Sequence, residues 1–114
     1  YQLSIEKMKQ GANQLLGKHD FTSFCSAKTD KDDKVRTIYS IEIVEKEDEI
    51  EFRFIGDGFL RNMVRILVGT LLEIGRGRRN SEDIITVLHS RDRERAGHTA
   101  PGHGLFLWKV NYDN

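Results

Sequence analysis

Residues 58–75 read GFLRNMVRILVGTLLEIG, and this stretch decides the fold. Ten of the 16 residues at positions 59–74 are large and apolar. At about 100° per residue, they cover roughly two thirds of a helical wheel. A helix with so little polar surface belongs inside a domain. The stretch is shorter than the roughly 20 apolar residues of a membrane span and contains arginines, so we predict a buried helix.

The polar residues of this predicted helix fall on one narrow strip. Arg61, Arg65, Gly69 and Glu73 follow one another at intervals of four residues, and Asn62 lies beside them. A buried arginine needs an anion or several acceptors, because an unpaired buried charge is very costly. Gly69 lowers helix propensity by about 1 kcal/mol relative to Ala, but it leaves room for another backbone or a ligand. Two interpretations stay open: the arginines pair with acidic residues of this chain, or they face a functional site.

The composition predicts one domain spanning residues 1–114, large enough for a hydrophobic core. Eighteen basic and eighteen acidic residues cancel, so net charge gives no argument for nucleic-acid binding. Residues 58–104 nevertheless carry eight Arg and no Lys, a set suited to bidentate contacts with carboxylate or phosphate. Cys25 is the only cysteine, and we expect a buried, reduced thiol.

No signal peptide or membrane-spanning run is visible, so we expect a soluble, cytoplasmic protein without membrane contact. The sequence begins at Tyr1 and enters a predicted helix almost at once. We therefore expect this chain to be a piece of a longer protein.

Helical spacing of apolar residues predicts a first helix, capped by Ser4 and ended by Gly17. Its expected inward residues are Ile5, Met8, Ala12, Leu15 and Leu16. Residues 19–24 are expected to form a loop, which Phe21 and Phe24 anchor to the core.

Alternation of apolar and polar residues predicts an antiparallel hairpin at positions 35–44 and 50–54. The expected buried face of its first strand holds Val35, Thr37, Tyr39, Ile41 and Ile43. A further helix should begin near residue 80, with Ile84, Ile85 and Leu88 inward, and residues 105–112 should form a final strand. The predicted fold class is therefore α+β: an antiparallel sheet backed by a long buried helix.

Metal sites are not expected. His19 stands alone, and a hydrogen bond within its loop is the more frequent role for such a residue. The Asp residues of positions 30–33 lack the glycine and later Glu of a calcium loop. His98 and His103 have no third ligand nearby for zinc.

Three separate blocks carry a family resemblance: LLGKHDFTSFC at 15–25, the helical stretch at 58–75, and APGHGLFL at 100–107. Together they resemble the C-terminal domain of TruA-type tRNA pseudouridine synthases, in one order and over essentially the whole chain. The resemblance implies half of a pseudouridine synthase fold. It also implies an enzyme that isomerises uridine to pseudouridine in the anticodon stem-loop of tRNA, works as a homodimer and needs no metal or organic cofactor.

In that family one Asp is the catalytic residue, within an Arg-Thr-Asp-Ala-Gly segment of the N-terminal half. This segment is absent here. The run at Lys28-Thr29-Asp30-Lys31 lacks its glycine and lies in the wrong context, so Asp30 is not assigned as catalytic. We therefore expect the chain to be inactive alone and to need the N-terminal half of the same protein.

The resemblance does assign supporting roles. Arg65 corresponds to the arginine that pairs with the catalytic Asp, and Arg61 and Asn62 would face the same cleft. Leu105 would help to line the uracil pocket. Lys28, Lys31 and Arg36 match positions that the family presents towards tRNA, although the acidic residues around the lysines make that surface less basic.

Two other hypotheses stay open. The chain could be a non-catalytic RNA-binding or dimerisation module of the same fold. It could also be an unrelated α+β domain whose arginines pair internally with Asp or Glu.

Overall fold

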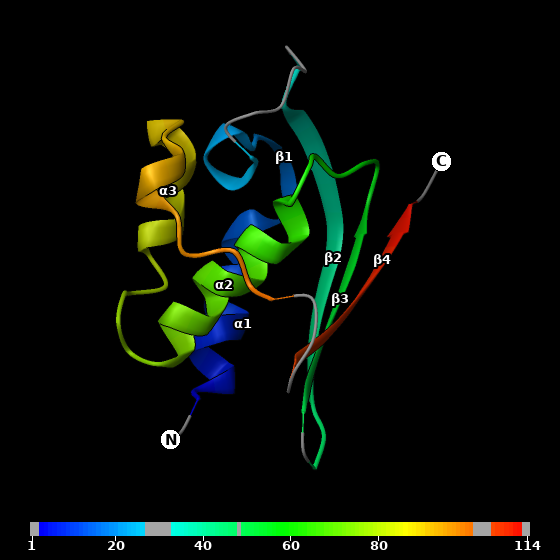
Figure 1. Ribbon diagram of the computed structural model, residues 1–114, viewed down its shortest axis with the longest axis vertical. Coiled ribbons are helices and arrows are strands. Elements are labelled where there is room, and N and C mark those ends of the chain that lie inside the picture. Colours follow the sequence, from blue (N-terminus) through cyan, green and yellow to red (C-terminus); the bar gives the residue numbers. More distant parts are fainter. Residues whose placement is uncertain (1–2, 27–32, 48, 102–105, 113–114) are drawn as a thin grey trace.

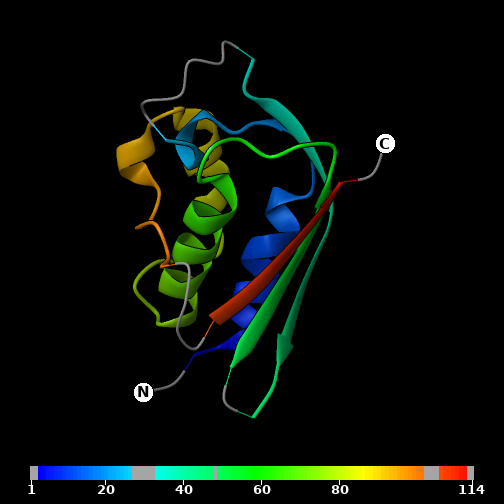
Figure 2. The same ribbon diagram turned by 45° about the vertical axis from the view of Figure 1, so that its right-hand side comes forward.

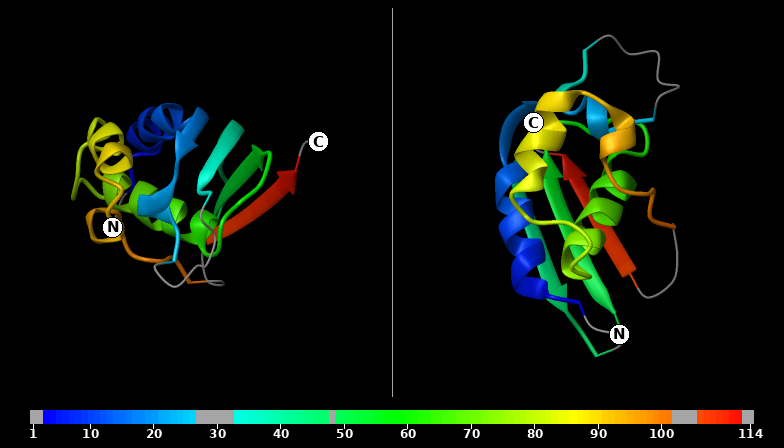
Figure 3. Two further views of the ribbon diagram at one scale, coloured as in Figure 1. Left: turned by 90° about the horizontal axis from the view of Figure 1, so that it is seen from above. Right: turned by 90° about the vertical axis from the view of Figure 1, so that its left-hand side faces the viewer.

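The computed structural model describes residues 3–26, 33–47 and 49–101, together with the backbone of residues 106–112. Three helices cover one face of a four-stranded sheet, so the described chain forms two layers (Figure 1; Figure 3, left). The other face of the sheet carries no helix in the described part of the chain (Figure 2). Within the described residues no helix is long and apolar enough to cross a bilayer.

Helix α1 spans Ile5–Leu15 and begins at the predicted cap, where the Ser4 hydroxyl accepts from the Lys7 amide at 3.2 Å. Met8, Ala12 and Leu15 are buried, as predicted. Leu16 is not: it lies beyond the helix and is 36% exposed. Gly17 adopts a φ of +98°, the left-handed conformation that favours glycine after a helix.

The sheet has the order β1-β2-β3-β4. Strands β1 (Gly17–Asp20), β2 (Val35–Glu45) and β3 (Ile50–Gly56) are antiparallel, and β4 (Phe106–Tyr112) lies parallel to β3. The prediction of a purely antiparallel sheet was therefore wrong at its last strand. The chain passes through two helices between β3 and β4, and a helical crossover of this kind returns the next strand in the same direction.

Strand β1 was predicted as part of a loop. Its sequence, Gly-Lys-His-Asp, has no apolar alternation, and the strand exists because it pairs with the start of β2, from Gly17 opposite Ile38 to Asp20 opposite Val35. The 3-10 turn η1 (Thr22–Phe24) follows. Phe21 and Phe24 are fully buried and anchor this region to the core, as predicted.

A β-bulge changes the predicted face of β2. The register with β3 shifts between Ile38 and Ser40, so Tyr39 is the extra residue and is 51% exposed. Beyond the bulge Ile41 and Ile43 face the core, but before it the buried residue is Ile38. A bulge adds one residue to one strand, and it therefore reverses a period-two pattern on one side of itself.

Helix α2 spans Met63–Gly75, and 11 of its residues are buried. It begins four residues later than the predicted start at position 59. Asn62 takes a left-handed conformation with φ of +61°, and Arg61 lies in the preceding turn. Arg61 is therefore not a member of the helical strip, which on α2 consists of Arg65, Gly69 and Glu73.

Helix α3 spans Asp83–Ser90, and the 3-10 turn η2 (Arg93–Arg95) follows it. Ile84 and Leu88 are buried as predicted, whereas Ile85 is 39% exposed. The core lies between the sheet and the helices, and its largest fully buried side chains are Phe21, Phe24, Phe52, Phe54, Met8, Leu15, Ile38, Met63, Ile66, Leu67, Leu71 and Leu72.

Candidate functional site around Arg65

Arg65 lies on the side of α2 that the 97–101 segment crosses, and its side chain is half-buried (Figure 1, orange trace over α2). Its Nε donates to the Ala100 carbonyl at 2.7 Å, and the Ala100 amide donates back to the Arg65 carbonyl at 3.0 Å. Across residues 3–26, 33–47 and 49–101, no Asp or Glu forms an ion pair with Arg65. The guanidinium is thus anchored through one edge to a neutral acceptor, and its charge is not neutralised there.

Gly69 allows the 97–101 segment to lie directly on the helix. A Cβ at position 69 would collide with the carbonyl group of His98, and it would lie 3.4 Å from the Ala100 amide nitrogen. The prediction that this glycine permits close approach of another chain segment is confirmed, and the segment is the chain's own backbone. Gly97 is its counterpart, because a Cβ there would lie 2.8 Å from the Thr70 Cα.

Two further side chains hold the same segment. The buried Thr70 hydroxyl accepts from the Gly97 amide at 2.8 Å and donates to the Ile66 carbonyl at 2.8 Å. Arg93 donates from Nη1 to the Gly97 carbonyl at 2.9 Å and from Nη2 to the Thr99 hydroxyl at 3.2 Å. The segment is therefore bonded to α2 on one side and to η2 on the other.

Glu73, at the far end of the strip, is paired within the chain. Its Oε1 accepts from Arg79 Nε at 3.1 Å, and its Oε2 accepts from the His98 amide and lies 3.2 Å from His98 Nδ1. Burial alone would raise the pKa of Glu73, but the hydrogen bonds from His98 and the charge of Arg79 outweigh it and lower the pKa below its ordinary value. Glu73 is therefore ionised and bonded on both oxygens.

The structure separates the predicted strip into two parts. The internal-pairing interpretation holds for Glu73, whose partners Arg79 and His98 were not identified from the sequence. It does not hold for Arg65 within the described residues. The signal that could have found the contact was Gly69 in the middle of the strip, together with a second glycine at position 97.

Arg61 and Asn62 are both exposed in the turn before α2. The backbone carbonyl of Arg61 accepts from the Ser26 amide at 3.1 Å, which ties this turn to the end of the η1 region. The Asn62 side chain makes no capping hydrogen bond, while its carbonyl accepts from the Ile66 amide at 2.9 Å. Both side chains therefore point from a fixed turn into solvent.

Arg36 lies on β2, is half-buried, and donates from Nη1 to the carbonyls of Asp33 and Val35 at 3.1 and 2.7 Å. It holds the strand's own backbone in this structure. The other three predicted contact residues, Lys28, Lys31 and Leu105, lie outside the described residues.

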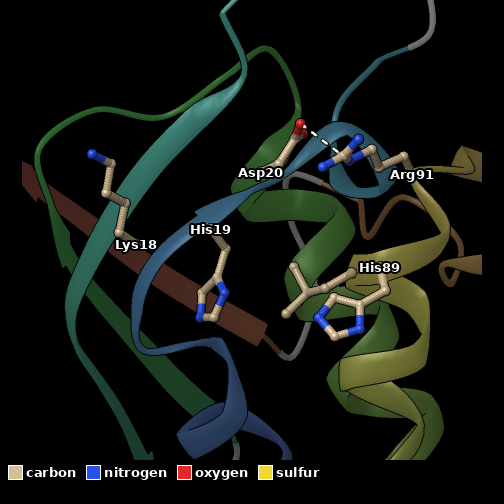
Figure 4. A pocket seen from close by; sticks show the side chains of 6 residues that line it. Lys18, His19, Asp20, His89 and Arg91 are labelled. Atoms are coloured by element: carbon tan, nitrogen blue, oxygen red, sulfur yellow. Dashed lines mark ion pairs between the residues drawn. The ribbon is translucent and has the colours of Figure 1, made fainter.

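A hollow of about 450 Å³ lies elsewhere, between β1 and the end of α3 (Figure 4). His19 and His89 extend into it from opposite elements, and Arg91 pairs with Asp20 at 3.4 Å. Burial would raise the pKa of Asp20, but hydrogen bonds from Thr22 and the charge of Arg91 lower it. This hollow contains its own carboxylate, and none of the residues assigned by the resemblance lines it.

Cys25 is buried, as predicted, and burial raises the pKa of its thiol. A thiol with a raised pKa is a poor nucleophile. Among the described residues no three His, Cys, Asp or Glu side chains gather closely enough to hold a metal ion.

The sequence profile described as tRNA pseudouridine synthase matches residues 12–113. Over all 114 residues the chain is 59% identical to tRNA pseudouridine synthase A of Anoxybacillus flavithermus, 58% identical to tRNA pseudouridine synthase A 1 of Bacillus cereus and 53% identical to tRNA pseudouridine synthase A of Bacillus subtilis. In each case it covers 46% of the relative, so the chain spans about half the length of these curated relatives. The match includes α2 with its polar strip and the 97–101 segment, and it confirms the resemblance drawn from the three sequence blocks. The chain belongs to the tRNA pseudouridine synthase family.

Proposed function

We propose that this chain is the C-terminal half of the catalytic fold of a tRNA pseudouridine synthase that converts uridine to pseudouridine in the anticodon stem-loop of tRNA. The observation that carries the proposal is Arg65. It is a half-buried guanidinium, fixed through Nε, whose charge meets no carboxylate in the part of the chain that the structure describes. A second half of the protein, of the size implied by the 46% coverage, would supply the missing partner.

The partner proposed for Arg65 is the catalytic Asp of the N-terminal half. An arginine within about 4–6 Å of a carboxyl lowers its pKa by roughly 1–3 units, which keeps the Asp ionised at neutral pH. A bidentate pair also fixes the orientation of the carboxylate. The chain alone would then be inactive, since the residue that attacks the nucleotide lies in the other half.

Contacts with tRNA are proposed for Arg61 and Asn62 and, from the family resemblance, for three further basic residues. Arg61 and Asn62 are displayed on a fixed turn directly before α2, where a guanidinium and an amide can reach phosphate or a base edge. Lys28, Lys31 and Arg36 would meet the phosphate backbone. Leu105 would contribute an apolar wall to the uracil pocket.

The remaining properties follow the family resemblance. We propose a cytoplasmic homodimer that acts on tRNA without a metal or an organic cofactor. The isomerisation itself is redox-neutral: the bond from ribose C1′ to uracil N1 breaks, a bond from C1′ to C5 forms, C5 loses its hydrogen as a proton, and N1 takes up a proton.

The test joins this chain to the N-terminal part of the Anoxybacillus relative and measures tritium released from tRNA labelled at uracil C5. We expect release by the joined protein, none by this chain alone, and a loss of roughly 10²-fold or more in Arg65→Met, because a misplaced or unsupported catalytic group costs about that much. Arg78→Met, which removes an exposed guanidinium outside the candidate site, is the control and should retain full activity.

Wild-type rates in Arg65→Met would refute the role assigned to Arg65. A joined protein that binds tRNA tightly but releases no tritium would instead support the alternative of a non-catalytic RNA-binding or dimerisation module.

A further inference from the structure

The 97–101 segment presents the Ala100 carbonyl to Arg65. Glu73, at the other end of the polar strip, holds the same segment and so helps to fix the position of that carbonyl. Ala100 is bonded to Arg65 in both directions, through Nε to the Ala100 carbonyl and through the Ala100 amide to the Arg65 carbonyl. Two residues earlier, His98 is bonded to Glu73 through both its amide and its ring. Arg65 and Glu73 therefore hold the same short backbone run at two points.

The bond through Nε determines which edge of the guanidinium stays available. Arginine offers N–H groups on Nε, Nη1 and Nη2 in one plane. When Nε is occupied by a carbonyl, a carboxylate can pair with two parallel N–H groups only at the end formed by Nη1 and Nη2. The Ala100 carbonyl thus directs an incoming carboxylate to the end of the Arg65 side chain.

We propose that Glu73 is a positioning residue for Arg65. It fixes the 97–101 segment on α2, so that Ala100 occupies Arg65 Nε and the Nη1–Nη2 end is the one that meets the carboxylate of the other half of the protein. The inference rests on the proposed function for the identity of that carboxylate. The fixing of Arg65 by Glu73 stands on the contacts within this chain.

Glu73 is well suited to this role because both its oxygens are used. Arg79, in the turn after α2, donates to Oε1, and His98 contacts Oε2 through both its backbone amide and its ring Nδ1. A carboxylate only accepts hydrogen bonds, so His98 Nδ1 carries the proton at this contact. Gly97 makes the approach possible, because a Cβ there would lie 2.8 Å from Glu73 Oε2. Glutamine at position 73 would replace one acceptor oxygen with an NH2 donor. That donor would face the N–H groups of either Arg79 or His98, and the hydrogen bonds at that oxygen position would be lost.

The anchoring can be measured without catalysis. In the joined protein with ¹⁵N-labelled arginine, exchange of the Arg65 Nε–H with water reports the bond to Ala100. We expect Glu73→Gln to speed this exchange by about tenfold, the effect of losing one hydrogen bond. The Nε–H of Arg53, bonded to Glu51 at 2.6 Å, is an internal reference that should not change. Glu94→Gln removes an exposed carboxylate close to the segment in sequence and is the matched control variant.

The same variants separate positioning from general structural damage. For Glu73→Gln we expect kcat to fall by roughly 10–100-fold with KM for tRNA nearly unchanged, because the perturbed group supports the catalytic carboxylate and not the RNA. Glu73→Asp, which keeps both acceptors on a shorter stem, should recover part of kcat. If Glu73→Gln does not fold, His98→Ala at a half-exposed position removes only the ring contact and should give a smaller change in the same direction.

Unchanged exchange of the Arg65 Nε–H in Glu73→Gln would overturn the proposal, as would a change in KM alone. If the joined protein releases no tritium in any version while the exchange still responds to Glu73→Gln, the proposed function fails and the positioning of Arg65 by Glu73 stands.

Discussion

Replacing Gly69 with alanine tests the packing of the 97–101 segment on α2 most directly. A helix-interior Gly→Ala change gains about 1 kcal/mol of helix propensity. Here the new methyl group would collide with the His98 carbonyl, which is backbone and cannot rotate away. The segment has to lift, and three hydrogen bonds beside the glycine are then lost or weakened: Gly97 to Thr70, Ala100 to the Arg65 carbonyl, and Arg65 to the Ala100 carbonyl.

The magnitude follows from these contacts. At about 1 kcal/mol net for each hydrogen bond, losing three costs about 3 kcal/mol, and the gain in helix propensity reduces this to about 2 kcal/mol of destabilisation. Urea denaturation measures the change in free energy of unfolding. Hydrogen exchange at the Gly97 and Ala100 amides should accelerate in the folded state.

Gly11 supplies the control. It is a buried glycine inside α1, and the atoms nearest to a Cβ there would be the tips of the Ile74 and Leu71 side chains, at 2.9 and 3.3 Å. Side-chain tips can shift, so Gly11→Ala should stay within about 1 kcal/mol of the original stability. If Gly69→Ala proves as stable as Gly11→Ala and keeps its amides protected, the close packing of the segment on α2 is refuted.

Three other predictions concern the rest of the fold. Ser4→Ala removes the cap of α1 and should lower the free energy of unfolding by about 1 kcal/mol, measured by urea denaturation. Hydrogen bonds from Arg53 and Lys46 lower the pKa of Glu51 from 4.5 to about 2. The contribution of this group to the free energy of unfolding is therefore complete above pH 4.5 and is lost as the pH falls towards 2. In acid titrations followed by circular dichroism, the stability of Glu51→Gln should therefore depend less on pH across this range than that of the original chain. Cys25 should react with iodoacetamide only slowly in the folded chain and fast in urea, since burial raises the pKa of its thiol and blocks access.

Much of the layer structure could be predicted from the sequence, because burial leaves a periodic trace. The inward residues Met8, Ala12 and Leu15 follow a helical period, and Ile41 and Ile43 follow a strand period. The misses occur where the backbone departs from the regular period. Tyr39 occupies a bulge, which periodicity alone does not reveal until the partner strand is known.

The start of α2 illustrates the same limit at the candidate site. The apolar period continues back to Phe59 and Leu60, and both pack on the core, but the left-handed Asn62 separates them from the helix. Periodicity reports which residues are buried and not which backbone conformation buries them. The apolar period therefore predicts Arg61 on the strip with Arg65, although the structure puts it in the turn before the helix.

Internal pairing applies to Glu73 at one end of the polar strip and not, within the described residues, to Arg65 at the other end, and the reason is the 97–101 segment. Spacing of four residues places Arg65, Gly69 and Glu73 on one face, but it does not reveal which segment, 25 to 35 residues further along the chain, packs on that face. The segment brings His98 to Glu73 and a carbonyl to Arg65. A carboxylate bonded to Arg79 and His98 is satisfied within the fold. Among the described residues the Arg65 side chain bonds one neutral carbonyl, and a buried guanidinium with that contact alone would be stable only while its Nη end reaches water or an anion. Arg65 is half-buried, so water can serve in the chain alone. Covering this face with a second half of the protein would remove that water, and the covering surface would then have to bring an anion or several acceptors, which the proposed carboxylate would supply.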